Sequence, residues 1–208
     1  DTEEIFTELC GIIDEVLTKP LPEVVEPADQ QASLTSLMRL GAVPLNLELS
    51  VDDTGRKDGL TTCPIIAVVG GPGSAVDVQC TRLVEKYPHC THIQAQDQGI
   101  DAIVSEVQSQ SEAEVIILEN FPVCRTQVEE FNEKIGGLCG MLVLDWSETT
   151  LEEQGADTTA LDQYKTETLP VLGHYDDKDK LYTVTGDRDV DEIFQDVTKV
   201  IDRLLSKD

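Results

Sequence analysis

The residues of this sequence best suited to chemistry lie in a glycine-rich turn between an apolar run and an amphipathic segment. Residues 65–69 read IIAVV, a run short enough for a strand buried on both faces. After the turn, apolar residues recur every three or four positions, which predicts a helix. Backbone N–H groups at a helix start attract anions, so this arrangement has the architecture of a phosphate-binding loop. Its residues are Gly70, Gly71, Pro72, Gly73, Ser74, Ala75, Val76, Asp77 and Val78.

The side chains that would hold a phosphate are missing from this loop. The phosphate-loop pattern ends in Gly-Lys-Ser/Thr, where the lysine reaches the phosphates and the hydroxyl meets Mg²⁺. Ala75 stands at the position of that glycine, Val76 at that of the lysine and Asp77 at that of the hydroxyl residue. At ~4 Å and an effective dielectric constant near 20, a carboxylate and a phosphate repel each other by roughly 4 kcal/mol. We expect the loop to keep its shape and to have lost its chemistry.

Several segments of the chain occur in the order found in one enzyme family. GGPGS followed by QC-x-x-LVEKY resembles the start of adenylate kinases of the short, cytosolic type, and the resemblance extends from about Pro64 to the C-terminus. EVIILENFPVCRTQVEEFNEKIGG is similar to that family's third strand, turn and following helix. The resemblance implies that Glu119 takes the place of an aspartate that positions Mg²⁺ through water. It also implies that Val123 replaces an arginine that grips the monophosphate.

Two further parts of that family's site are shortened in this sequence. THIQAQD keeps the Thr, His and Asp of the family's THxxxGD segment, but Gln96 replaces its glycine, and one predicted helix leads on to the next strand. Residues 147–161 stand where the family has a mobile lid with several arginines, and no arginine occurs between Arg125 and Arg188. The resemblance therefore implies that the monophosphate and lid subdomains are absent.

Alternating apolar strands and amphipathic helices predict a three-layer α/β domain over residues 62–208, of the phosphate-loop NTPase type. Its sheet should have five parallel strands in the order 2-3-1-4-5 with right-handed crossovers. The expected strands are residues 65–69, 90–93, 114–118, 140–146 and 181–184. The first helix should bury Val76, Cys80, Leu83, Val84 and Tyr87, and the last should bury Val190, Ile193, Phe194, Val197, Val200, Ile201 and Leu204.

Residues 1–61 lie outside the resemblance and are expected to form a helical extension and a linker. A helix over 2–17 ends before Pro20, and a shorter one is expected over 32–40. The first helix carries an apolar stripe of Ile5, Leu9, Ile12, Ile13, Val16 and Leu17. Followed by LPEVV, it is similar to the helical docking and dimerisation modules of kinase-anchoring systems. The stripe is expected to bind a protein partner or a second copy of the chain; the alternative is that it packs on the main domain.

Composition limits the classes of partner. A formal net charge of −26, with 15 Lys and Arg spread along the chain, argues against nucleic acid and anionic membranes. No signal peptide or apolar run of spanning length occurs. The six cysteines form no C-x-x-C pair and the three histidines show no metal-ligand spacing, so we expect no metal and reduced core thiols. These features favour a cytoplasmic protein, as part of a cytoskeletal or other large assembly.

Three functional interpretations remain open from the sequence. In the first, the chain is a non-catalytic, adenylate-kinase-like structural or protein-interaction subunit that needs no cofactor, because groups that act as a unit in phosphoryl transfer are lost together. In the second, it is a nucleotide-binding module without turnover, which uses the backbone N–H groups of Gly70, Gly71 and Gly73 and a cation at Glu119. In the third, it is an active nucleoside monophosphate kinase whose cationic groups come from a partner chain.

Overall fold

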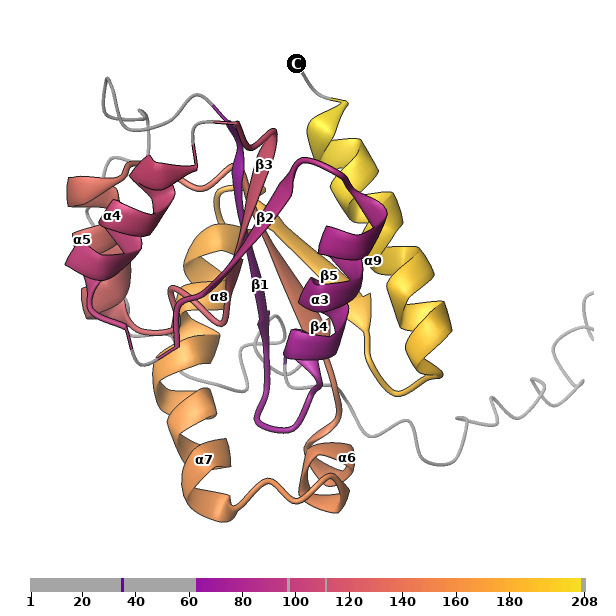
Figure 1. Ribbon diagram of the computed structural model, residues 1–208. Helices are drawn as coiled ribbons and strands as arrows, with labels where there is room; N and C mark the ends of the chain where they lie inside the picture. Colours follow the sequence, from indigo (N-terminus) through magenta and orange to yellow (C-terminus); the bar gives the residue numbers. More distant parts are fainter. Residues whose placement is uncertain (1–34, 36–62, 97, 111, 207–208) are drawn as a thin grey trace, which may run out of the picture. The chain divides into compact units, whose positions relative to one another are not determined.

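A computed structural model describes residues 35, 63–96, 98–110 and 112–206 of the chain (Figure 1). All of them belong to one unit, Gln31–Asp208. Apart from the helical Thr35, the predicted N-terminal helices and the apolar stripe from Ile5 to Leu17 lie outside the described residues. Thr35 is buried, and its backbone N–H donates to Asp145 Oδ1 at 3.2 Å. This residue of the predicted extension therefore contacts the carboxyl end of a strand of the main sheet.

The main sheet has five parallel strands in the order β2-β3-β1-β4-β5, which confirms the predicted topology (Figure 1). The strands are β1 (Ile65–Gly70), β2 (Cys90–Gln94), β3 (Val115–Glu119), β4 (Gly140–Asp145) and β5 (Leu181–Thr185). The two neighbours of β1 are β3 and β4, so β1 is the central strand. The loop after β1 thus opens at the middle of the carboxyl edge, where sheets of this kind bind ligands.

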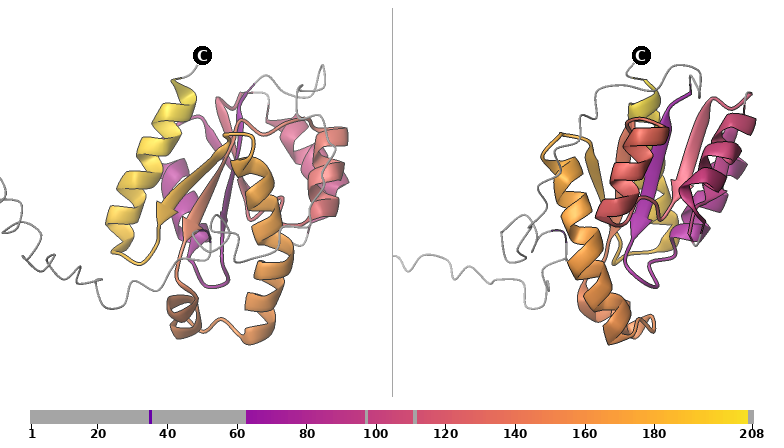
Figure 2. Two further views of the ribbon diagram at one scale, coloured as in Figure 1. Left: turned by 180° about the vertical axis from the view of Figure 1, so that it is seen from behind. Right: turned by 90° about the vertical axis from the view of Figure 1, so that its left-hand side faces the viewer.

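Helices cover both faces of the sheet and complete the three layers (Figure 2). On one face lie α3 (Val76–Lys86) and α9 (Val190–Leu205); on the other lie α4 (Ile100–Ser109), α5 (Arg125–Lys134) and α8 (Leu169–Asp176). Toward α3 and α9 the strands bury Ile66, Val68, Val115, Ile117, Leu142 and Leu144. Toward the other three helices they bury Ile65, Ala67, Val69, Ile116, Leu118, Met141 and Val143. Because neighbouring strand residues point to opposite faces, these apolar runs fill two cores at once.

The connections between strands differ in length. β2 and β3 are joined through α4 alone, whereas β4 is followed by α6 (Glu148–Glu153), α7 (Thr158–Gln163), the π-helix η1 (Tyr164–Thr168) and α8. The elements α7, η1 and α8 follow one another without a break. Side chains cap the N-termini of α6 and α7. Ser147 Oγ accepts a hydrogen bond from Thr150 N–H at 3.2 Å, and Asp157 Oδ1 accepts one from Ala160 N–H at 2.7 Å.

The buried face of α3 differs from the prediction at two of five positions, because Val84 is exposed and Tyr87, the C-cap residue, is half-buried. Three of its predicted core residues are buried, but Val84 is 39% exposed and Gln79 is buried instead. Gln79 Nε2 donates to the carbonyl of Val190 at 3.3 Å, which gives the amide a partner where α3 meets α9. Val190, predicted on the apolar side of α9, is 42% exposed in its first turn. None of the described helices has the length and apolar character that a membrane span requires.

The single tryptophan of the chain, Trp146, directly follows β4. It packs against the cores on both faces of the sheet. A Cβ atom at Gly186 would lie 2.1 Å from Cδ1 and Nε1 of this indole, so a side chain at position 186 would collide with the ring. Glycine is therefore required where the chain leaves β5 beside Trp146.

Candidate functional site

The glycine-rich loop after β1 is held by hydrogen bonds to itself and to the end of β3. The backbone N–H and the Oγ of Ser74 both donate to the carbonyl of Gly71, at 3.1 and 2.6 Å. The N–H of Gly70 donates to Asn120 Oδ1 at 3.3 Å. A Cβ atom at Gly70 would lie 2.1 Å from Ser74 Oγ, so this close approach needs glycine. The structure thus has the predicted strand, turn and helix start.

Ala75, the N-cap residue of α3, has left-handed backbone angles of φ 53° and ψ 40°. Such angles cost a residue with a Cβ roughly 1–2 kcal/mol. Glycine avoids this strain, but its more flexible unfolded state offsets part of the gain in stability. Ala75→Gly is therefore expected to raise the free energy of unfolding by about 0.5–1 kcal/mol, measured by urea denaturation. The matched control is Ala102→Gly on the exposed side of α4, which should lower it by about 0.5–1 kcal/mol. Equal losses in both variants would contradict the strain at Ala75.

The two residues at the start of α3 leave no cation beside the loop. Val76 is 3% exposed and packs in the core between the sheet, α3 and α9. Asp77 lies exposed in the first turn of α3. A carboxylate there is stabilised by the helix dipole, the same field that would otherwise favour a bound anion. Val78 follows with 40% of its surface exposed.

A cavity of about 840 Å³ lies at the carboxyl edge of the sheet. It is lined by the glycine-rich loop, the end of β3, the start of α5, and residues of α7 and η1. Three carboxylates line it, those of Asp77, Glu119 and Glu167, and the described lining residues include no lysine or arginine. The cavity therefore carries a negative potential, which attracts cations and repels phosphate groups.

The π-helix η1 forms one wall of this cavity with Tyr164, Glu167 and Thr168. Short π-helical turns inside longer helices often occur at functional sites. Burial, with a smaller contribution from the Asp145 carboxylate, raises the pKa of Tyr164 well above its usual range. A tyrosine phenol is neutral at physiological pH even at its usual pKa, and the raised pKa keeps it neutral, so it supplies no charge to the cavity.

The sequence singled out two positions here, Glu119 at the end of β3 and Val123 in the turn beyond it. Both line the cavity. The buried Glu119 carboxylate forms a hydrogen bond with His92 Nε2 at 2.7 Å. The backbone N–H of Val123 donates to Gln127 Oε1 at 2.8 Å. Arg125, two residues further on, pairs with Glu129 at 2.7 Å along the exposed side of α5 and is not among the cavity residues.

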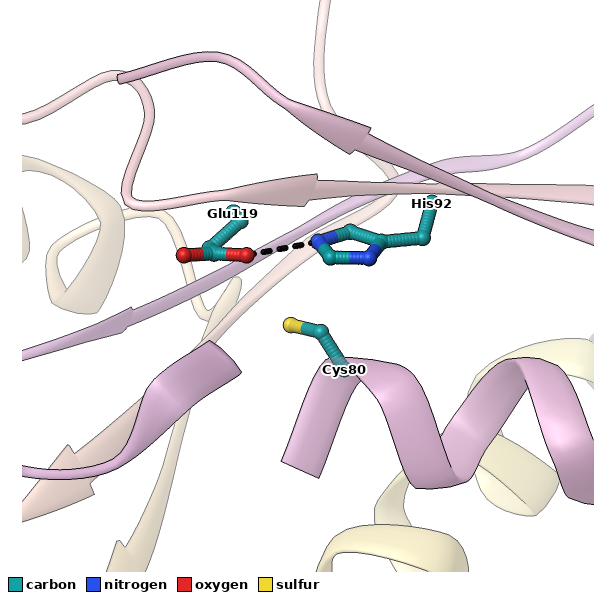
Figure 3. A group of neighbouring side chains, drawn as sticks. All are labelled: Cys80, His92 and Glu119. Carbon is teal, nitrogen blue, oxygen red and sulfur yellow. Dashed lines mark hydrogen bonds and ion pairs between the residues drawn. The ribbon is translucent and has the colours of Figure 1, made fainter. Parts of the chain in front are cut away.

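A cluster that sequence reading missed lies beside Glu119. Cys80 of α3 points toward the His92–Glu119 pair, and one ligand atom from each of the three residues lies within 4.8 Å of the others (Figure 3). Local spacing gave no hint of it, because the residues are 12 and 27 positions apart on three elements. The strand order together with the register of β2 and β3 would have predicted the His92–Glu119 contact.

A cysteine, a histidine and a carboxylate are also the groups of a nucleophilic triad, but this geometry does not suit one. A reactive cysteine needs a low pKa and access to substrate. Cys80 is fully buried, and this burial raises the pKa of its thiol well above the usual value. The Nε2 of His92 already bonds Glu119. The arrangement therefore offers ligand atoms rather than an activated nucleophile.

Comparison with known proteins finds nucleotide kinases. The chain is 26% identical over 192 residues to adenylate kinase isoenzyme 1 of Cyprinus carpio, with 71% of this chain and 98% of the carp protein covered. It is 24% identical over 196 residues to adenylate kinase isoenzyme 5 of Bos taurus, covering 73% of this chain and 35% of the bovine protein. UMP-CMP kinase 1 of Oryza sativa subsp. japonica is 26% identical over 186 residues, covering 67% of this chain and 74% of the rice protein. No protein-family model matches the chain.

These similarities indicate homology to adenylate kinases at low identity, and they agree with the strand order of the sheet. The alignment with the carp protein spans 192 positions, but only 71% of this 208-residue chain takes part in it. Many of the aligned positions are therefore gaps in this chain. Segments of the carp protein therefore have no counterpart here.

Proposed function

We propose that this chain is a non-catalytic, adenylate-kinase-like protein that acts as a structural or protein-interaction subunit. The observation that supports this most directly is the lining of the cavity. Asp77, Glu119 and Glu167 face the space beside the glycine-rich loop, and the described lining supplies no lysine or arginine. Phosphoryl transfer depends on cations that neutralise the transferring group, so a cavity of this charge opposes the reaction.

The charge penalty for a bound phosphate is substantial. At ~4 Å and an effective dielectric constant near 20, each carboxylate repels one unit of phosphate charge by roughly 4 kcal/mol. Lys165, in the π-helix η1 that lines the cavity, is already paired with Glu148. The described residues that line the cavity therefore offer a nucleotide no cation beside the loop.

The lengths of the connections support the same proposal. Only α4 separates β2 from β3, and just four residues lie between the end of α6 and the start of α7. We propose that residues 62–208 form an adenylate-kinase-like domain without the monophosphate and lid subdomains. The alignment supports this proposal, because this chain contributes fewer residues to it than the carp protein does.

The interaction is proposed to reside in the N-terminal extension, residues 1–61, through a protein partner or a second copy of the chain. Its apolar stripe over 5–17 has six aliphatic residues that need a buried environment. Glu3, Glu4 and Asp14 flank this stripe, so a partner with a basic rim fits best.

Calorimetric titration tests the proposal against nucleotide binding without turnover. The full chain is titrated with MgATP, MgADP and AMP, and we expect dissociation constants above ~1 mM, which corresponds to less than about 4 kcal/mol of binding free energy. Sulfate serves as a control for general anion effects, and Asp77→Asn as a variant with one carboxylate fewer. The cavity is large enough for a small-molecule ligand. Saturable sub-millimolar binding of MgATP without turnover would favour the alternative that the chain is a nucleotide-binding module.

A further inference from the structure

Three side chains of typical metal-ligand type meet on the face of the sheet that α3 covers. Cys80 comes from α3, His92 from β2 and Glu119 from β3 (Figure 3). A sulfur, a ring nitrogen and a carboxylate oxygen are the three ligand atoms that zinc sites draw on. Here one of each lies within 4.8 Å of the other two.

The fold itself holds this cluster together. His92 pairs with Ile117 across the parallel ladder, and Glu119 follows Ile117 by two residues, so both side chains project from the same face. Cys80 packs in the core between that face and α3. The ligand atoms are therefore positioned by two neighbouring strands and one packed helix, which is the rigid support that a metal site needs.

We propose that Cys80, His92 and Glu119 form a binding site for one Zn²⁺ ion, with one coordination position open toward the cavity. Around a tetrahedral zinc ion with bonds of about 2.0–2.3 Å, ligand atoms lie roughly 3.3–3.8 Å apart. The His92–Glu119 contact of 2.7 Å would lengthen as the ion enters among the ligand atoms, which all lie within 4.8 Å of one another. The ion replaces the hydrogen bond between His92 and Glu119.

Charge balance favours an ion over an empty cluster once the thiol ionises. A cysteine ligand binds metal as the thiolate, so Cys80 and Glu119 together carry two negative charges and the imidazole carries none. Buried charges are tolerated when they are paired or coordinate a metal. One divalent cation neutralises this set, and the thiol proton is released to water as the ion binds.

The cavity provides a route for the ion and a place for its remaining ligand. Glu119 both belongs to the cluster and lines the cavity. Asp77 and Glu167 line the same space, so the local potential concentrates cations there. Three protein ligands plus a water or an anionic oxygen from the cavity side complete a four-coordinate site.

The donor set selects among divalent cations. Mg²⁺ and Ca²⁺ prefer six or more oxygen ligands, and this cluster offers one carboxylate. Thiolate and imidazole suit Zn²⁺, and Co²⁺ takes the same tetrahedral geometry with a measurable colour. We therefore expect zinc and cobalt to compete for one site and millimolar Mg²⁺ to displace neither.

The test is a cobalt titration of the full chain, treated with a chelator and kept reduced. We expect a thiolate-to-cobalt charge-transfer band in the near ultraviolet that saturates at one ion per chain and disappears when one equivalent of Zn²⁺ is added. Cys80→Ser should abolish the band. His92→Asn should weaken zinc affinity by more than ~100-fold, since loss of a second-sphere partner alone typically costs 10–100-fold.

Cys139→Ser is the matched control, because this thiol precedes β4 and lies outside the cluster. It should leave the band and the stoichiometry unchanged. Circular dichroism of each metal-free variant checks folding, and His92→Asn carries the test if Cys80→Ser does not fold. The proposal is overturned if no saturable band forms, if the band survives in Cys80→Ser, if His92→Asn keeps zinc affinity close to that of the unchanged chain, or if Mg²⁺ displaces cobalt.

Discussion

Phosphoryl transfer between MgATP and AMP by this chain is expected to be at least ~10⁵-fold slower than transfer by a functional adenylate kinase measured alongside it. Removal of a single group that stabilises transition-state charge costs about 10²–10³-fold in rate, and loss of a catalytic arginine about 10³–10⁵-fold. The resemblance to adenylate kinases predicts that the buried Val76 and the cavity residue Val123 stand at two such positions. A coupled assay of ADP formation gives the rate.

A host kinase that co-purifies could imitate weak activity, so the same preparation of Glu119→Gln is the control. Activity of the chain itself should change when this cavity carboxylate is neutralised, whereas activity of a contaminant should not. Turnover within ~100-fold of the reference enzyme that responds to Glu119→Gln would refute a non-catalytic role, because it would require most of the lost stabilisation to be restored.

Disruption of the N-terminal stripe is expected to cause the second large effect. The double variant Ile12→Asp/Val16→Asp removes two aliphatic side chains, each worth roughly 1.5–3 kcal/mol when fully buried, and places charges in their position. If the stripe joins two copies of the chain, the dissociation constant of the dimer should rise by more than ~100-fold, which equals about 2.7 kcal/mol.

Sedimentation equilibrium of the full chain measures this association, and urea denaturation of the same samples measures stability. Thr7→Gln, on the side of the predicted helix opposite the stripe, is the control that should leave both unchanged. A double variant that keeps its assembly state but unfolds at lower urea concentration would show that the stripe is core, and would end the proposal that it is an interface.

Sequence patterns predicted the sheet well, because buried parallel strands have a strong signature. Runs such as IIAVV and MLVL are apolar throughout, and in the structure their residues alternate between the two cores. Individual helix faces were harder to predict. Gln79 is buried because the backbone of Val190 accepts its amide, a contact set by how α9 lies against α3. Periodicity within one helix carries no information about that neighbour.

Some residues of the candidate site could likewise be predicted from the sequence, and others could not. The loop, Glu119 and Val123 could be placed from the sequence, since the loop follows β1 directly, Glu119 ends β3, and Val123 lies in the turn after it. The third carboxylate of the cavity, Glu167, lies on a π-helical turn that no residue pattern indicated. The Cys80–His92–Glu119 cluster required the strand order and register as well as the residue types. Chemistry that spans three elements is visible only after folding.

The position of Trp146 gives the protein an intrinsic optical reporter. It is the sole tryptophan of the chain, it lies between the two cores at the end of β4, and no described residue accepts a hydrogen bond from its indole N–H. Selective excitation of the indole therefore reads the environment of this edge of the sheet alone. Unfolding transfers the ring to water and moves its emission to longer wavelengths. Stability measurements can thus follow this edge by fluorescence without an attached label.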